Sequence, residues 1–175
     1  MSAPQSALPT ATTLHRAGTW SGPAESCALT YEARFFRRRK LTVAAGWSFV
    51  AAFERAVSLA HGDALALSDG RLVEVQAAPE ALLTVTGDLA RIAWHVGNRH
   101  APCQVEPTRL LVQDEPVMGR MLTQLGAIVT PITAPFTPEG GAYGQGRALG
   151  HSHDHDLETG HSHHNHRGAK ARHGP

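Results

Sequence analysis

Hydrophobic and polar residues alternate over several short stretches in the first half of the chain. This two-residue period is typical of β-strands that bury one face. In the first stretch, Leu29, Tyr31 and Ala33 fall on one side. Asp69 and Gly70 form a strong hairpin signal between two later stretches. The pattern therefore predicts an all-β unit, with strands expected at Cys27–Phe36, Leu41–Ala45, Ala64–Leu67 and Leu72–Ala77.

Two stretches of the same half are harder to assign. The aromatic residues of Trp47–Phe53 alternate as in a strand, whereas Ala51, Ala52 and the charged pair that follows favour a helix. The period alone leaves both open. The basic run Arg37–Lys40 separates two expected strands. It is either a docking surface for a partner or a solvated turn, and we interpret it as the turn.

Two helices are expected in the second half. Asp88 is a good N-cap for Leu89–Val96, and Gly97 ends that helix. A second helix begins near Pro116, a residue that is favoured at the first helical position, and Gly126 ends it. The residues expected on its buried side are Val117, Met121, Leu122 and Leu125.

Short strands are expected around these helices, at Cys103–Glu106 and Leu110–Val112. A β-rich run follows at Ala127–Ile132, broken by Pro131 and Pro135. The order of helix, strand, strand, helix and strand predicts a split βαβ sandwich. The fold class expected for the whole chain is therefore α+β, with an all-β first domain.

Composition divides the chain into four parts. Residues 1–26 are small, polar and proline-rich, which predicts a disordered leader. Residues 27–87 form the expected β domain, residues 88–147 the split βαβ domain, and residues 148–175 a flexible histidine-rich tail. The formal net charge of +1 argues against general nucleic-acid binding.

Two cysteines, Cys27 and Cys103, give no disulfide pattern and suggest a reducing compartment. No stretch of about 18 apolar residues is present to span a membrane, and Met1–Thr13 lacks the features of a signal peptide. We therefore expect a cytoplasmic protein without membrane contact. No arrangement of acidic or nucleophilic residues suits acid–base or covalent catalysis, so we expect no enzymatic activity.

Histidines dominate the last 25 residues, which hold eight of the twelve in the chain. Neutral imidazole is the commonest protein ligand of divalent ions such as Ni, Zn, Cu and Co. Acidic residues interrupt the tract, unlike most purification tags, so a tag or a purely solubilising tail are the less favoured alternatives. The histidines are His151, His153, His155, His161, His163, His164, His166 and His173.

A second group of candidate ligands lies within the folded part. His95 falls on the last turn of the first expected helix, and His100 lies just beyond its glycine stop. Their spacing of five residues does not place them on one helical face. Taken alone, His100 is interpreted as a surface histidine, and His95 as one that the helix carbonyls satisfy.

The chain resembles the urease accessory proteins called UreE. The motif that carries the resemblance is Trp94–Gln104, which contains Gly-Asn-Arg-His. The collinear blocks that extend it are Leu29–Arg34, Gly62–Asp63, Ser68–Gly70, Val75–Glu80, Met121–Gly126, Ala134–Tyr143 and the histidine-rich terminus. The resemblance covers the chain from about residue 27 to its end.

This resemblance implies a nickel metallochaperone. Members of the family are homodimers with a β domain similar to a peptide-binding module and a ferredoxin-like metal-binding domain. They deliver Ni(II) to apo-urease together with the accessory GTPase UreG. The resemblance assigns the central ligand to His100, paired with its copy across a twofold axis. The tail histidines would supply further ligands.

Three residues are weaker candidates as ligands. His95 is one. Asp114 aligns with one of two peripheral histidines of some family members, but Pro116 replaces the other and has no ligating side chain. Cys103 is a possible thiolate neighbour of His100 or simply a half-buried strand residue. Zn(II), Cu(II) and Co(II) are expected competitors, because Cu(II) outranks Ni(II) at most nitrogen and oxygen sites.

Two other functions stay open at this point. The tail alone would suffice for a protein that stores or buffers zinc, copper or nickel. Alternatively, the β domain would bind peptides as a chaperone, with metal binding incidental. Loss of metal binding on removal of the tail would indicate storage or buffering. Peptide binding by residues 27–87 without metal would indicate a chaperone.

Overall fold

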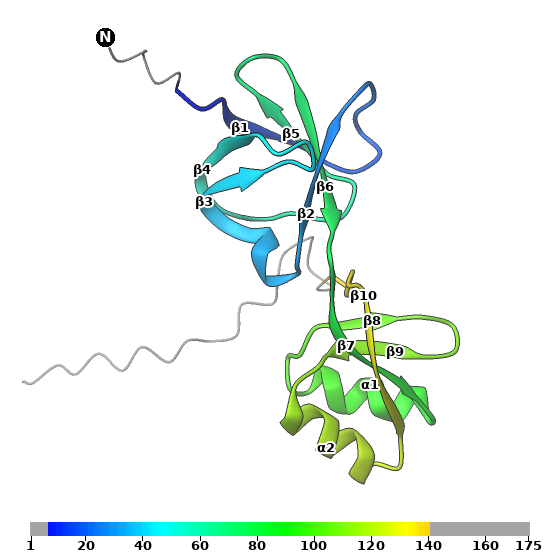
Figure 1. The fold of residues 1–175 in the computed structure, drawn as a ribbon. Helices are drawn as coiled ribbons and strands as arrows, with labels where there is room; N and C mark the ends of the chain where they lie inside the picture. The colour runs from blue at the N-terminus through cyan, green and yellow to red at the C-terminus, as the bar shows by residue number, and fades with distance from the viewer. Residues whose placement is uncertain (1–6, 141–175) are drawn as a thin grey trace, which may run out of the picture.

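The computed structural model describes residues 7–140, which form two β-sheets joined by a short connection (Figure 1). The first sheet has six strands and the second has four, with two helices. Both helices lie on the same side of the second sheet (Figure 1). Within residues 7–140 no helix has the length and apolar character needed to cross a bilayer. The expected α+β class is confirmed.

The first sheet contains strands β1 to β6 in the order β2-β6-β5-β1-β4-β3. Two of its pairings, β1 with β4 and β2 with β6, are parallel, and the others are antiparallel. A short 3-10 helix, η1 (Glu32–Arg34), lies between β2 and β3. The strands are β1 (Thr10–His15), β2 (Glu25–Leu29), β3 (Phe35–Thr42), β4 (Ser48–Ser58), β5 (Ala64–Leu67) and β6 (Leu72–Ala77).

This sheet curls, so that the end of β3 comes back to β2. The backbone N–H of Ala44 donates to the carbonyl of Ser26 over 2.9 Å. Nearby, the Trp47 indole N–H donates to the Glu25 carboxylate, and the Arg71 guanidinium stacks 3.7 Å from the Trp47 ring centroid. Because the sheet curls, it encloses one apolar core. The largest fully buried side chains of this core are Phe49, Leu65, Val73 and Val75.

The second sheet is antiparallel, with the order β10-β7-β9-β8. Helix residues Ile92, Val96, Met118 and Leu122 cover one face of it. This is the expected split βαβ, or ferredoxin-like, arrangement. Its elements are β7 (Pro79–Thr86), α1 (Leu89–Gly97), β8 (Cys103–Val105), β9 (Leu110–Gln113), α2 (Pro116–Gln124) and β10 (Ile128–Pro135).

The other face of the second sheet packs against the first domain. Phe136 is fully buried there beside Leu82 and Leu111, and its ring meets the edge of Tyr31 with centroids 5.5 Å apart. The Arg34 guanidinium donates to the Phe136 carbonyl. The Tyr31 N–H of the first domain also donates to the carboxylate of Glu80, on β7 of the second, over 2.8 Å. Apolar packing and polar contacts therefore both join the two domains.

The first correction concerns the leader expected at 1–26. Thr10–His15 is strand β1, inserted between β4 and β5, and Glu25 already belongs to β2. Ala11 is fully buried there, whereas Thr12 and Thr13 are exposed, so this strand shows little of the apolar alternation that marks the others.

The change of domain also comes earlier than the expected 87/88 boundary. It falls at Ala78, because β7 pairs with β9 and β10 rather than with the first sheet.

Five local assignments are also corrected or settled. Cys27–Phe36 is not one strand, because η1 interrupts it, and the basic run Arg37–Lys40 lies inside β3 rather than in a turn. The undecided stretch around Phe49 is strand β4. Val117 is exposed, and Met118 is buried instead, because it shares a helical face with Leu122, four residues later. Pro131 does not break β10, which lies at a sheet edge where proline is tolerated.

Candidate metal-binding site

His100 projects from a tight turn at the end of α1. The helix begins as expected, with the Asp88 carboxylate accepting from the Arg91 N–H over 3.2 Å. After Gly97 the chain turns back on itself, and the His100 N–H donates to the Gly97 carbonyl over 2.9 Å. The φ of His100 is 54°, so its backbone is left-handed; it is the one such non-glycine residue among residues 7–140. Histidine tolerates this conformation better than most residues do.

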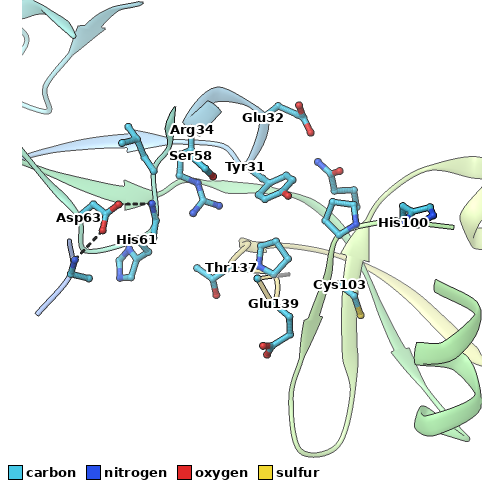
Figure 2. A pocket seen from close by; sticks show the side chains of 18 of the residues that line it. Tyr31, Glu32, Arg34, Ser58, His61, Asp63, His100, Cys103, Thr137 and Glu139 are labelled. Carbon is cyan, nitrogen blue, oxygen red and sulfur yellow. Dashed lines mark hydrogen bonds between the residues drawn. The ribbon is translucent and has the colours of Figure 1, made fainter. Parts of the chain in front are cut away.

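The side chain of His100 is exposed on an open cleft of about 940 Å³ between the two domains. Figure 2 shows His100 and Cys103 on the side of the second sheet, and His61 and Asp63 on the side of the first. Glu139 follows β10 and also lines the cleft. No hydrogen bond joins the His100 imidazole to another residue of the described range, so either ring nitrogen can present the lone pair of the neutral ring.

Cys103 is a poor ligand in its present state. Burial, and secondarily the negative charge of Glu139, raises the pKa of the Cys103 thiol to about 11. The Glu139 backbone N–H donates to the Cys103 carbonyl over 2.8 Å, which keeps that acidic residue close. Because the thiolate rather than the thiol binds metals, Cys103 is not prepared for coordination at neutral pH.

The structure does not bring the other two weaker candidates to the cleft. His95 is half-buried on α1, with its ring edge-on to Trp94 at 4.9 Å between centroids. Asp114 is exposed just before α2, where its backbone N–H donates to the Ala81 carbonyl over 3.2 Å. Neither lines the cleft that contains His100.

The tail histidines of the sequence analysis fall outside residues 7–140. Inside that range, no three histidine, cysteine or acidic side chains are grouped as a metal site. The described residues therefore present His100 without a group of further candidate ligands beside it, so an ion held there would need ligands from elsewhere. The tail residues concerned are His151, His153, His155, His161, His163, His164, His166 and His173.

His61 is a cleft residue that the sequence analysis did not single out. Its Nδ1 accepts from the Ala77 N–H over 3.2 Å, so in the neutral ring the proton sits on Nε2. A ring in that state has no free lone pair to offer a metal. Only the turn signal at Gly62 marks this position in the sequence, and it carries no information about the cleft.

Asp63 forms the wall of the cleft beside His61. It is almost fully buried, and its carboxylate accepts from the Arg16 guanidinium at 2.8 Å and from the backbone N–H groups of Ala17 and Ala60 at 2.9 Å. All these bonds are internal to the first domain. Asp63 is therefore occupied in holding the turn in place, and it is not available to an ion.

The chain is similar over most of its length to proteins of one family. The family model described as UreE urease accessory protein, C-terminal domain, matches residues 71–167, and the N-terminal domain model matches residues 5–78. A Rhodobacter capsulatus protein named Urease accessory protein UreE is 55% identical over 137 residues, which is 78% of this chain and 88% of that protein. Proteins of the same name from Ruegeria pomeroyi and Cereibacter sphaeroides are each 50% identical over 147 residues. These two alignments cover 83% of this chain, and 99% and 81% of the relatives.

Proposed function

The chain belongs to the UreE family of urease accessory proteins, and from this premise we propose that it is a nickel metallochaperone that delivers Ni(II) to apo-urease. The ion is cargo for assembly of the dinuclear nickel centre, and the chain itself performs no catalysis. The observation that carries the proposal is the presentation of His100. It is an exposed imidazole, fixed at a helix end and facing an open cleft.

The proposed site is completed by a second copy of the chain. A twofold axis near His100 supplies a pair of imidazoles from one residue per protomer. The described residues of one protomer offer no third ligand, so the pair holds Ni(II) with open coordination positions. Such a site exchanges ligands readily, whereas a closed four-ligand site retains its ion.

Histidines of the tail are proposed to capture Ni(II) and pass it to the His100 pair. Asp114 would add an oxygen ligand at the periphery, where Pro116 cannot contribute. The number and type of nitrogen ligands do not exclude Zn(II), Cu(II) or Co(II). Selectivity is therefore assigned to metal availability and to the receiving partner.

The partners proposed are the urease apoprotein and the GTPase UreG, which would withdraw the ion through better-matched ligands. We place this delivery of nickel in the cytoplasm, where thiols such as that of Cys103 stay reduced. Neither nucleic acid nor a membrane takes part.

Calorimetric Ni(II) titration tests the interface site. Four proteins are compared: the full chain, the chain ending at Gly150, and each of these with His100→Asn. Asparagine removes the imidazole but tolerates the left-handed backbone of this position, so the turn is preserved. We expect the shortened chain to bind about one ion per two subunits, as one shared site at a twofold axis requires, and His100→Asn to abolish this binding.

The matched control is His61→Asn, which removes the other exposed histidine of the same cleft and should leave Ni(II) binding unchanged. If the shortened chain binds no Ni(II), the tail is the whole metal function and a storage or buffering protein becomes the better description. Metal loss in His61→Asn equal to that in His100→Asn would contradict the assignment of the central ligand.

A further inference from the structure

Strand β3 forms an open edge of the six-stranded sheet. It pairs with β4 alone in the part of the chain that the structure describes. At its end the edge is closed by β2, through the hydrogen bond from Ala44 to Ser26. At its start the Leu59 N–H donates to the Arg34 carbonyl over 2.8 Å, which extends the pairing with β4 on the inner side of the strand. The basic run Arg37–Lys40 lies between this point and the closure by β2, and we call it the basic edge.

The hydrogen-bonding register shows which peptide groups of the basic edge point outward. The Val43 N–H donates to the carbonyl of Trp47, the residue just before β4, and bonded pairs alternate with non-bonded pairs in an antiparallel ladder. Lys40 therefore forms a non-bonded pair with Val50. The Val50 N–H confirms this, because it donates away from β3, to the carbonyl of Pro9 over 2.9 Å. The N–H and C=O groups of Lys40 and, two residues earlier, Arg38 consequently face away from the sheet.

The side chains of the basic edge are exposed, and none of the ion pairs among residues 7–140 includes them. Arg38 and Lys40 lie on one face of the strand. Arg39 lies on the other, opposite Ala51, with its guanidinium donating to the Ala33 carbonyl over 3.2 Å. The ladder register shifts between Phe36 and Arg38, where β4 has the extra residues, so Arg37 lies opposite a bulge. The charges thus surround the free backbone groups on both faces.

We propose that the basic edge is a docking site for an acidic, extended segment of a partner protein, which adds to the sheet beside β3. Two outward peptide groups supply the backbone bonds of strand addition. Because strand side chains alternate between faces, consecutive Asp or Glu residues in the partner would meet cations on both faces. A ligand that lies flat on one face of the sheet would meet only part of this charge. The proposal does not depend on nickel binding.

The same charges also keep sheet edges from pairing with other copies of the chain. A purely protective edge can be distinguished from a docking site, because it binds no acidic strand. The test uses the metal-free full chain at pH 8. Binding of a fluorescein-labelled peptide, Thr-Glu-Glu-Glu-Glu-Thr, is followed by fluorescence anisotropy.

Three variants separate charge from backbone. Lys40→Gln and Lys40→Pro both remove one cation, but only proline also removes the outward N–H, and proline is tolerated at sheet edges. Arg38→Gln with Lys40→Gln removes two cations. The control, Arg91→Gln with Arg120→Gln, removes two exposed cations from the helices of the other domain. Circular dichroism checks that each variant keeps its strands.

We expect the Arg38/Lys40 double variant to bind the peptide about tenfold more weakly, as loss of two close ion pairs implies, and the control pair to bind as the parent does. Lys40→Pro should bind at least about threefold more weakly than Lys40→Gln, the effect of one lost hydrogen bond. Equal affinity of these two variants would overturn strand addition. Absence of peptide binding, or tighter binding of a single-stranded oligonucleotide of equal charge, would overturn the acidic-protein partner.

Discussion

The two domains use their polar side chains in opposite ways. In the first, Asp63 is buried and its carboxylate is satisfied by three donors, and Trp47 is fixed between Glu25 and Arg71. In the second, His100 is exposed, and its imidazole bonds to no other described residue. These polar groups of the first domain are thus already paired within the fold. Among residues 7–140, the proposed ligand His100 is left without such internal partners, which is what the proposed site for transferable cargo would require.

The junction between the domains is expected to give the largest effect on stability. Phe136→Ala removes a fully buried ring that packs on Leu82, Leu111 and Tyr31, so it should lower the free energy of unfolding by about 3–5 kcal/mol. Urea denaturation followed by tryptophan fluorescence measures this. Ile128→Ala, on the same strand β10 but 70% exposed, is the control. A similar loss in both variants would show that Phe136 does not join the domains.

Asp63→Ala tests the occupied polar groups of the first domain. It leaves two backbone N–H groups and one guanidinium without their buried acceptor, and should lower the free energy of unfolding by roughly 3 kcal/mol. Asp69→Ala removes an exposed carboxylate whose partner is Arg71, and should change stability little. Equal denaturation midpoints for the two variants would contradict the contrast between buried and exposed acids.

Local signals in the sequence are sufficient for the second domain. The cap at Asp88, the proline start at Pro116 and the order of elements predict its helices within a residue or two, because helix ends depend on neighbours along the chain. The resemblance to UreE directs attention to His100, but its left-handed backbone and the cleft are visible only in the structure.

Long-range pairing explains what the sequence did not reveal. The sequence around β1 predicts a disordered leader, because its threonine-rich pattern is weak and its partners β4 and β5 lie far away along the chain. The four charges of the basic edge hide the alternation of a strand, so the sequence favours a turn there. His61 and Glu139 meet the cleft from different domains, so spacing along the chain carries no trace of their proximity.

A smaller effect is expected from the backbone of His100 itself. His100→Val places a β-branched residue at a φ of 54° and should lower the free energy of unfolding by about 1–2 kcal/mol. His100→Gly fits the same conformation and should cost less than valine does. Thermal unfolding of the metal-free variants measures the difference. Equal stability of the two would show that the turn relaxes, so that the fold does not hold the imidazole in place.

The smallest effect on stability at neutral pH concerns Cys103, whose thiol the fold keeps protonated. With its pKa raised to about 11, mainly by burial, the thiol should react with iodoacetamide at pH 8 roughly a hundredfold more slowly than one of pKa 9. Mass spectrometry of the alkylated peptides separates Cys103 from Cys27. Glu139→Gln should speed the reaction slightly, since the Glu139 charge is the second cause.

The direction of the pH dependence follows from the same pKa. The folded state favours the thiol, so Cys103 contributes its stability fully below about pH 9 and loses it as the pH rises toward 11, where the thiol of the folded chain also ionises. The alkylation rate should therefore keep rising up to that pH. A rate that levels off near pH 8 would reveal a thiolate beside His100. Cys103 would then offer Ni(II) a sulfur ligand within the second domain, in addition to the proposed ligand His100.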